Sequence, residues 1–159
     1  MSVVTKYLEQ RGISFEVIPH QRAFTSVDEA RTMGVEADEV LKTVVVDTSS
    51  RHALAVVPGS RRLDMHRVRE AVGDQHAHLA TEDELARDFP RFELGAFPPL
   101  GSLLGVETFV DPEVSQHETV VFAAGTQTES VRLKTADLFR DEKVHYAPLV
   151  REPGEDSTT

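Results

Sequence analysis

The feature that most restricts the fold is a pair of prolines enclosed by two glycines, in the stretch Gly95-Ala96-Phe97-Pro98-Pro99-Leu100-Gly101. Pro98 and Pro99 fix φ and offer no backbone N–H, so they cannot lie inside a helix or a central strand. Gly95 and Gly101 can adopt positive φ and let a ligand or another backbone segment come close. We therefore predict a stiff loop. Taken alone, it is either part of a binding site or a plain tight turn.

The chain has 159 residues, which suits one domain with its own core. We expect the domain to span residues 1–150. The polar segment 151–159, which contains Pro and Gly, is expected to be a disordered tail. Helical and strand patterns are mixed along the chain. They predict an α/β (α+β) fold, with a mixed, mainly antiparallel, curved sheet flanked by helices.

Capping signals and hydrophobic spacing predict the individual elements. Ser26–Glu29 and Thr81–Glu84 have capping-box spacing. Helices are expected at 5–10, 26–33, 63–72, 81–89 and 135–139, the last of them capped by Thr135. Strands are expected at 15–18, 41–47, 53–57, 106–110, 119–123, 130–133 and 144–146. The unalternated Val44–Val46 run indicates a strand buried on both faces, and Gly125–Thr128 reads as a hairpin loop.

The charge balance limits the partners. There are 17 basic and 27 acidic residues, which give a net charge of −10. Such a surface repels nucleic acid at long range, which disfavours non-specific nucleic-acid binding over the whole surface. Arg61, Arg62, Arg67 and Arg69 are either solvated surface charges or a local basic site for the end of a nucleic acid.

Two absences in the sequence narrow the class of protein. There is no cysteine, so disulfides, thiolate metal sites and a cysteine nucleophile are excluded. The sequence has no apolar stretch long enough to cross a bilayer and no signal-peptide pattern at its start. We therefore expect no membrane partner and a cytoplasmic location.

Lys42 is the second candidate for a functional residue. It lies near the start of the apolar strand 41–47. A lysine in such a strand either extends its ammonium group to the surface or occupies a polar pocket. In a pocket it would offer a positive charge to a phosphate or a carboxylate.

The histidines give weaker signals. On a strand, His76 and His78 would share one face and could bind a metal. No carboxylate-rich segment with ligand spacing lies near them in the sequence, so we expect neither a metal nor another cofactor. His20, which precedes the predicted helix at 26–33, either lines a pocket or lies on the surface.

No motif for a covalent nucleophile is present. The sequence lacks Gly-x-Ser-x-Gly, a phosphate loop and a dinucleotide fingerprint. Ser60 and Ser102 are interpreted as turn residues. If the chain is an enzyme, its chemistry would depend on positioning and on hydrogen-bond donors. In the stiff loop, backbone donors could come only from Gly95, Ala96, Phe97, Leu100 or Gly101.

The order of these segments resembles the YbaK/prolyl-tRNA-synthetase-associated domain family, which deacylates mischarged aminoacyl-tRNA. The resemblance runs from Thr5 to Tyr146, and its most specific elements are the Lys42 strand and the Gly-x-x-x-Pro loop together. The segments that carry it are 41–44, 53–64, 79–84, 95–101, 110–111 and 122–125.

The resemblance implies roles for particular residues. Lys42 would help to hold the tRNA acceptor end, and Gly95–Pro99 would position the aminoacyl ester and the terminal adenosine. Lys42, Gly95 and Pro99 are thus the predicted catalytic residues. The predicted substrate-binding residues are His20, Thr43, Ala96, Phe97, Pro98, Gly101, Gly125 and Thr126.

The implied activity is that of a free-standing aminoacyl-tRNA deacylase. A positioned water, helped by the ribose hydroxyl of the substrate, would hydrolyse mischarged tRNA(Pro) that carries alanine or cysteine. An aminoacyl-tRNA synthetase is a candidate partner, since a protein of charge −10 should bind tRNA weakly by itself. Two alternatives stay open: a non-catalytic module that binds a tRNA end or a nucleotide, and a metal-dependent hydrolase that uses His76 and His78.

Overall fold

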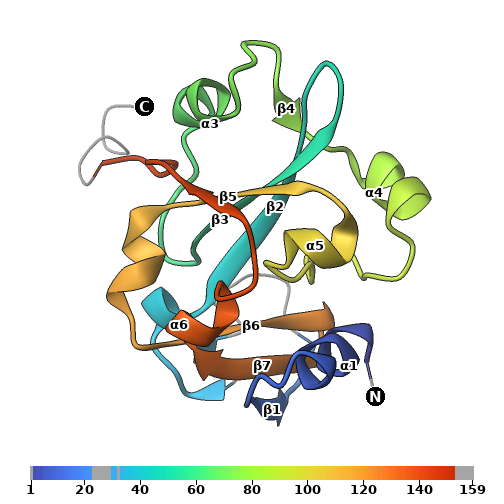
Figure 1. Cartoon of the computed structure of the whole chain (residues 1–159), viewed down its shortest axis with the longest axis vertical. Helices are drawn as coiled ribbons and strands as arrows, with labels where there is room; N and C mark the ends of the chain where they lie inside the picture. The colour runs from blue at the N-terminus through green and yellow to red at the C-terminus, as the bar shows by residue number, and fades with distance from the viewer. Residues whose placement is uncertain (1, 23–29, 32, 153–159) are drawn as a thin grey trace.

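The computed structural model describes residues 2–22, 30–31 and 33–152 (Figure 1). Most of the helix predicted at 26–33, including its capping box, lies outside these residues. The helices are α1 Val3–Gln10, η1 Ala37–Glu39, α3 Met65–Val72, α4 Glu82–Asp88, α5 Gly101–Leu104, η2 Pro112–Gln116 and α6 Thr135–Leu138. The strands are β1 Glu16–Pro19, β2 Leu41–Asp47, β3 His52–Pro58, β4 His78–Leu79, β5 Glu107–Val110, β6 Thr119–Thr126, β7 Glu129–Lys134 and β8 Val144–Tyr146.

These strands form two sheets rather than one. The smaller sheet has the order β1-β7-β6, and the larger has the order β4-β2-β3-β5-β8. All neighbours are antiparallel except β3–β5 and β5–β8, which are parallel. An isolated bridge between Val40 and Val121 joins the sheets. The predicted α/β (α+β) class with mainly antiparallel pairing is confirmed, with the strands divided between two sheets.

The hairpin of β2 and β3 separates two hydrophobic cores. Side chains alternate across a strand, so Leu41 and Val45 face one side of β2 and Val46 faces the other. Leu41 and Val45 belong to the larger core, together with Phe97 of the predicted stiff loop. Val46 belongs to the smaller core around α3. The prediction that this strand is covered on both faces is therefore confirmed.

Capping explains where the helices near this hairpin begin and end. The Asp64 side chain accepts from the N–H groups of His66 and Arg67 at the start of α3, and Gly73 ends that helix with φ +74°. Thr81 and Glu84 form the predicted capping box of α4.

The last helix departs from its predicted cap. Lys134 is the N-cap residue of α6, and Thr135 is the first helical residue. The Thr135 hydroxyl donates to the carbonyl of His117 at 2.6 Å instead of capping the helix. The prediction that Thr135 caps α6 is wrong, because its hydroxyl ties the helix to the segment before β6.

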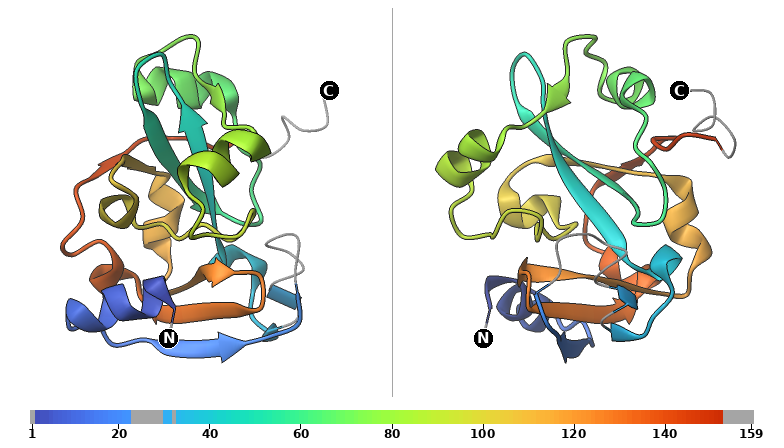
Figure 2. Two further views of the ribbon diagram at one scale, coloured as in Figure 1. Left: turned by 90° about the vertical axis from the view of Figure 1, so that its right-hand side faces the viewer. Right: turned by 180° about the vertical axis from the view of Figure 1, so that it is seen from behind.

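The two ends of the molecule differ in content. The tip of the β2–β3 hairpin, β4 and α3 lie at one end, while the smaller sheet and α1 lie at the other (Figures 1 and 2). At the C-terminus, Val150 bridges Leu63, and the Arg151 N–H donates to the Arg62 carbonyl at 2.8 Å. Residues 153–159, most of the predicted tail, lie outside the described residues. None of the described helices has the length and apolar character needed to cross a membrane.

The start of α5 has room only for glycine. A Cβ at Gly101 would lie 2.0 Å from the Thr108 Oγ1 and 2.6 Å from the Val106 carbonyl oxygen. We predict that Gly101→Ala lowers the free energy of unfolding by about 3 kcal/mol, because the Thr108 side chain on β5 and the Val106 backbone just before it must both move to relieve the overlap. Urea-induced unfolding measures this change.

Gly105→Ala is the matched control in the same turn. Gly105 has φ +76° and open space around its missing Cβ, so its substitution adds only backbone strain of about 1 kcal/mol. A cost at position 101 no larger than the cost at position 105 would contradict the packing explanation.

Candidate active site

The predicted stiff loop is anchored on strand β6 through one glycine. The Glu93 N–H donates to the Gly125 carbonyl at 2.8 Å, and the Gly125 N–H donates to the Ala96 carbonyl at 3.1 Å. Gly125 has φ +93°, and a Cβ there would lie 3.3 Å from the Phe92 Cδ1. The β6–β7 register shifts between Ala123 and Thr126. Strand β6 therefore continues beyond its predicted end, through an irregularity that turns Gly125 toward the loop.

The loop is also part of the core. Ala96 and Leu100 are fully buried, and Phe97 is 5 % exposed. The Phe97 ring meets Phe89 edge-on at 5.9 Å between centroids and Phe92 at 5.5 Å. Pro98 and Pro99 are buried as well. Both packing and hydrogen bonds thus hold the backbone in place, which is more than a tight turn requires.

The N–H groups of this loop fall into two kinds. The Ala96 N–H donates to the Glu93 carbonyl at 3.0 Å, so it cannot serve a ligand without breaking that bond. The N–H groups of Gly95 and Phe97 have no hydrogen-bond partner among the described residues. Of the five donors that the sequence allows, Ala96 is therefore occupied, and Gly95 and Phe97 are the ones that flank it.

Lys42 lies on β2 and is partly buried. Its Nζ donates to the Arg61 carbonyl at 3.3 Å, on the face of β2 that also carries Val44 and Val46. Burial, and secondarily the positive charge of Arg62, lower the pKa of Lys42 below its ordinary value. The ammonium group therefore sits beside a carbonyl at the surface of the smaller core.

Thr43 lies at an open edge of the larger sheet. The Val40 carbonyl accepts from Gly59 on the β3 side, while the Val45 carbonyl accepts from Ala80 on the opposite side. Peptide groups alternate in direction along a strand, so the N–H and C=O of Thr43 also point away from β3. Strand β4 pairs only with Val46 and Asp47. The Thr43 peptide groups therefore face an edge that no described strand covers.

The Thr43 side chain adds a further polar group. Its Oγ1 is buried and has no hydrogen-bond partner among the described residues. Leaving a buried hydroxyl unsatisfied costs about 1–3 kcal/mol. Such a group is a candidate contact for a bound molecule.

His20 and Thr126 lie at the same end of the smaller sheet. The His20 N–H donates to the Thr128 carbonyl at 2.9 Å, and its Nε2 lies 2.9 Å from the Ser130 Oγ. Arg22 and the Gln127 N–H both contact Glu93 at the start of the loop, at 3.4 Å and 2.9 Å. The structure thus brings His20, Gly125, Thr126 and the loop into one neighbourhood. The described contacts of Lys42 lie on the Arg61 side instead.

The arginine cluster mostly supports the fold. Arg61 pairs with Glu113, and the Arg69 Nε donates to the Ala77 carbonyl at 2.9 Å. Arg67 lies 3.8 Å from Asp64 and donates to the Val150 carbonyl. Three of the four arginines therefore tie segments of this chain together.

An open groove of about 1130 Å³ lies beside α5. Of the predicted site residues, only Gly101 lines it. Ser102, also on this groove, contacts Tyr7 and donates its N–H to the Glu142 Oε1 at 3.1 Å. The Ser102 hydroxyl also donates to Glu142. Because these contacts fix its position between α1 and the segment before β8, they favour a structural role for Ser102.

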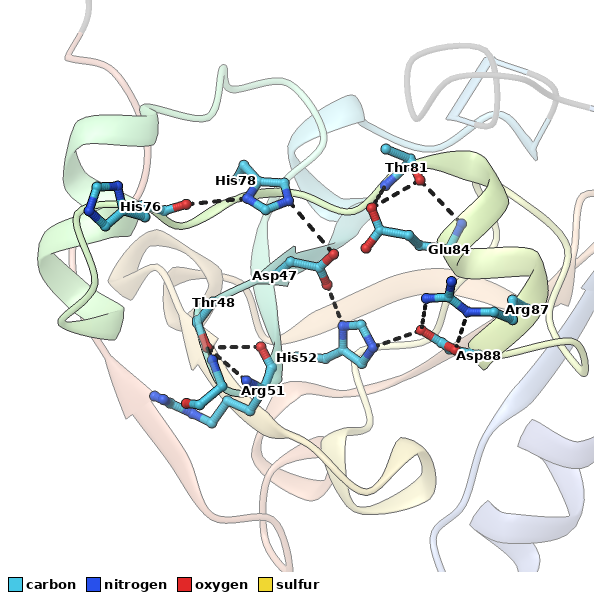
Figure 3. A network of polar contacts seen from close by, with 11 residues as sticks. Asp47, Thr48, Arg51, His52, His76, His78, Thr81, Glu84, Arg87 and Asp88 are labelled. Atoms are coloured by element: carbon cyan, nitrogen blue, oxygen red, sulfur yellow. Dashed lines mark hydrogen bonds and ion pairs between the residues drawn. The ribbon is translucent and has the colours of Figure 1, made fainter.

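One polar network was missed by the sequence analysis. Asp47, His52, His78 and Glu84 come together at the end of β2, together with Asp88 (Figure 3). The expectation that no carboxylates with ligand spacing lie near His76 and His78 is wrong for His78, because β2–β4 pairing and the start of α4 bring Asp47 and Glu84 beside it. His76 precedes β4 and its side chain is not in the group. The capping-box Glu84 and the acidic end of a buried strand were the available signals.

The comparisons with known proteins decide the family. The family model of the aminoacyl-tRNA editing domain matches residues 20–140, which include both Lys42 and the stiff loop. This chain belongs to the aminoacyl-tRNA editing domain family. The family predicted from the order of segments is therefore confirmed.

Two curated relatives cover most of this editing domain. The multifunctional Ser/Thr-tRNA deacylase ProXp-y of Escherichia coli is 28 % identical over 138 residues, which are 84 % of this chain and 82 % of that protein. The proline–tRNA ligase of Fervidobacterium nodosum is 27 % identical over 136 residues. That match covers 86 % of this chain but only 23 % of the ligase.

A solved structure shares the fold. It was described as a candidate trans-editing enzyme for prolyl-tRNA synthetase, and it superposes with a TM-score of 0.83 at 24 % identity. The match covers 94 % of this chain and 95 % of the other. The two-sheet arrangement is therefore the fold of a known structure, and the Escherichia coli relative is named for the reaction class that the sequence predicts.

The anchoring of the loop on Gly125 gives a direct prediction. Gly125→Ala places a side chain at φ +93° and against Phe92, which should lower the free energy of unfolding by about 1–3 kcal/mol. It should also weaken the Glu93-to-Gly125 hydrogen bond. Amide hydrogen exchange, measured by NMR, should then show faster exchange of the Glu93 N–H.

Gly12→Ala provides the control for this substitution. Gly12 has φ +68° and open space around its missing Cβ, and it lies at the end of α1. Its substitution should strain the backbone without changing the exchange of the Glu93 N–H. Equal exchange rates in the two variants would show that Gly125 does not hold the loop.

Proposed function

We propose that this editing domain hydrolyses the ester bond of mischarged aminoacyl-tRNA. The observation that carries the proposal is the family match across residues 20–140, which contains Lys42 and the anchored Gly-x-x-x-Pro loop together. The Escherichia coli deacylase, matched over 82 % of its length, supports a free-standing enzyme. Such a substrate would place the protein in the cytoplasm, where tRNAs are charged.

The loop supplies the electrostatic part of the reaction. Attack on the ester carbonyl creates a negatively charged oxygen, and fixed N–H donors stabilise that charge. The N–H groups of Gly95 and Phe97 are available for this role, and burial of the loop keeps them in place. Pro98 and Pro99 cannot donate, and they instead restrict the loop backbone between Phe97 and Leu100.

The attacking group in this proposal is water. A ribose hydroxyl of the substrate would assist it. The described site does contain a serine–histidine contact, between the Ser130 Oγ and the His20 Nε2 at 2.9 Å, but Ser130 is fully buried and so is poorly placed to act as a nucleophile. An aminoacyl ester is already labile, so lowering the barrier by several kcal/mol would suffice. Positioning of the ester is a contribution of that size, and so is stabilisation of the charged oxygen by two N–H donors.

The open edge of β2 offers contacts for the rest of the substrate. The peptide groups and the unsatisfied hydroxyl of Thr43 would hydrogen-bond to the aminoacyl-adenosine end. Lys42, one residue away on the other face, would contact a phosphate of the acceptor strand. Thr43 would thus recognise the aminoacyl-adenosine end, and Lys42 would recognise the phosphate backbone of the tRNA.

The specific substrate we propose is tRNA(Pro) carrying alanine or cysteine. A synthetase that binds proline cannot reject small or similar amino acids by large factors, so a second site is needed to remove them. The net charge of −10 disfavours tight tRNA binding by the domain alone. We therefore propose a prolyl-tRNA synthetase as the partner that delivers the substrate.

The first test is deacylation of tRNA(Pro) charged with alanine, cysteine, serine, threonine or proline. The wild-type chain should hydrolyse the alanyl or the cysteinyl ester faster than the prolyl ester. Lys42→Met, which keeps the aliphatic stem, should lower kcat/KM by at least about tenfold, because one charge-assisted contact contributes about 1.5–3 kcal/mol.

Lys6→Met is the matched control, since it removes the same charge from an exposed position on α1. It should leave kcat/KM within about twofold, because an isolated exposed charge contributes little. Binding of an acylated acceptor-stem mimic without hydrolysis of any ester would favour the non-catalytic alternative. Equal rates for Lys42→Met and wild type would remove Lys42 from the site.

The second test addresses the unsatisfied hydroxyl. Thr43→Val replaces the buried Oγ1 with a methyl group of similar size, so the free energy of unfolding should stay equal or rise. If the hydroxyl contacts the substrate, kcat/KM should fall by about fivefold or more. Thr43→Ser, which keeps the hydroxyl, should retain more activity than Thr43→Val, and the opposite order would contradict the assignment.

A further inference from the structure

Two parts of the chain about thirty residues apart, the β2–β3 hairpin and the β4–α4 segment, meet at the end of β2. Asp47 is the last residue of β2, and its register partners are His52 at the start of β3 and His78 on β4. Glu84 comes from the first turn of α4. Figure 3 shows the side chains of His78 and Glu84 directed toward the Asp47 carboxylate. One donor atom each from Asp47, His78 and Glu84 lies within 4.8 Å of the other two.

Asp47 is the buried member of this cluster. It is 7 % exposed, and its Oδ1 contacts the His52 Nδ1. Burial is the main cause that raises the pKa of Asp47, and the neighbouring Glu84 carboxylate raises it further. Two negative charges this close repel each other, and a cation between them would relieve that repulsion.

His78 is oriented in a way that leaves an acceptor facing the carboxylates. Its Nδ1 lies 3.2 Å from the His76 carbonyl, which can only accept a hydrogen bond. The Nδ1 therefore carries the proton, and the Nε2 of the neutral ring presents a lone pair. That Nε2 lies 3.8 Å from the Asp47 Oδ2. Three acceptor atoms thus converge, one each from Asp47, His78 and Glu84. A cation bound to all three would draw them closer together.

The remaining atoms of these groups are held by other partners. The Thr81 hydroxyl donates to the Glu84 Oε1 at 3.0 Å within the capping box. His52 bridges Asp47 to Asp88, with its Nε2 3.0 Å from the Asp88 Oδ2. Metal ligands in proteins are oriented by such contacts, most often a histidine N–H bonded to a backbone carbonyl or a carboxylate. The cluster has this second set of contacts already in place.

We propose that Asp47, His78 and Glu84 bind a divalent transition-metal cation, with water completing the coordination. One imidazole and two carboxylates suit Zn²⁺ or Mn²⁺ better than Mg²⁺, which prefers oxygen ligands alone. The site is separate from the residues of the proposed deacylation reaction.

Binding at this position would join β2, β4 and α4. The His52 ring lies 5.2 Å from Phe89, which in turn meets Phe97 of the loop edge-on. Phe89 directly follows α4. A cation that holds α4 in place would therefore also hold Phe89, where the segment that leads to the stiff loop begins. The expected role is structural, because a cation bound to the native state raises its stability.

The test is calorimetric titration of the chelator-treated, full-length chain with ZnCl₂ and, separately, with MnCl₂. The wild-type chain should bind one equivalent of at least one metal. His78→Ala and Glu84→Gln should each weaken that binding by at least about tenfold. Both positions are at or near the surface, so the variants should fold, and circular dichroism checks this.

Two exposed histidines serve as matched controls. His76→Ala keeps the carbonyl that orients His78, and His66→Ala removes the histidine of a His66–Glu70 pair on α3. Neither should change the affinity. No stoichiometric binding by the wild type, or equal binding by His78→Ala and Glu84→Gln, would overturn the proposal. A loss with His76→Ala as large as with His78→Ala would also overturn it.

The pH dependence gives an independent readout. The cation competes with protons on Asp47, Glu84 and His78, so affinity should fall as the pH is lowered from about 8 to about 6. The charged groups packed around these ligands are His52 on β3 and Arg87 and Asp88 on α4. Titration in two buffers with different ionisation enthalpies should show proton release on binding. An affinity that does not change with pH would contradict ligation by these groups.

Discussion

The hydrogen bonds between Gly125 and the Gly95–Pro99 loop are the interaction on which the proposed site depends. They hold Ala96 within the loop and Glu93 two residues before its start. Only glycine accepts φ +93° at position 125 without strain. The β6–β7 hairpin thus holds the loop in position, although the loop precedes it by about thirty residues in the sequence. The Gly95 and Phe97 N–H groups are left for a ligand as a result of this arrangement.

Strand β2 relates the loop to the rest of the molecule. One face of β2 shares a core with Phe97, and the other packs toward α3. Its edge is paired with β4 only at Val46 and Asp47, which leaves Thr43 at an uncovered edge. The same strand ends in the Asp47 cluster. A single short strand therefore carries the proposed substrate-binding edge near one end and the proposed metal site at the other.

Much of this structure could be predicted from sequence, and the limits have physical causes. The capping box at Thr81, the stop at Gly73 and the stiff loop are local signals, and all three are confirmed. The Asp47 cluster was missed because it forms only when β2 pairs with β4 and the start of α4 comes to lie beside them. The division of the strands into two sheets depends on long-range pairing as well. The roles of Lys42 and the loop residues in catalysis stay predictions.

The most direct measurement is a crystal structure of this chain with a non-hydrolysable aminoacyl-adenosine, in which an amide replaces the ester. We expect the carbonyl oxygen of this amide to lie within about 3.2 Å of the Gly95 or Phe97 nitrogen. We also expect a hydrogen bond between Thr43 and the bound molecule. An analogue bound instead in the groove beside α5, with those N–H groups and Thr43 uncontacted, would contradict the proposed site.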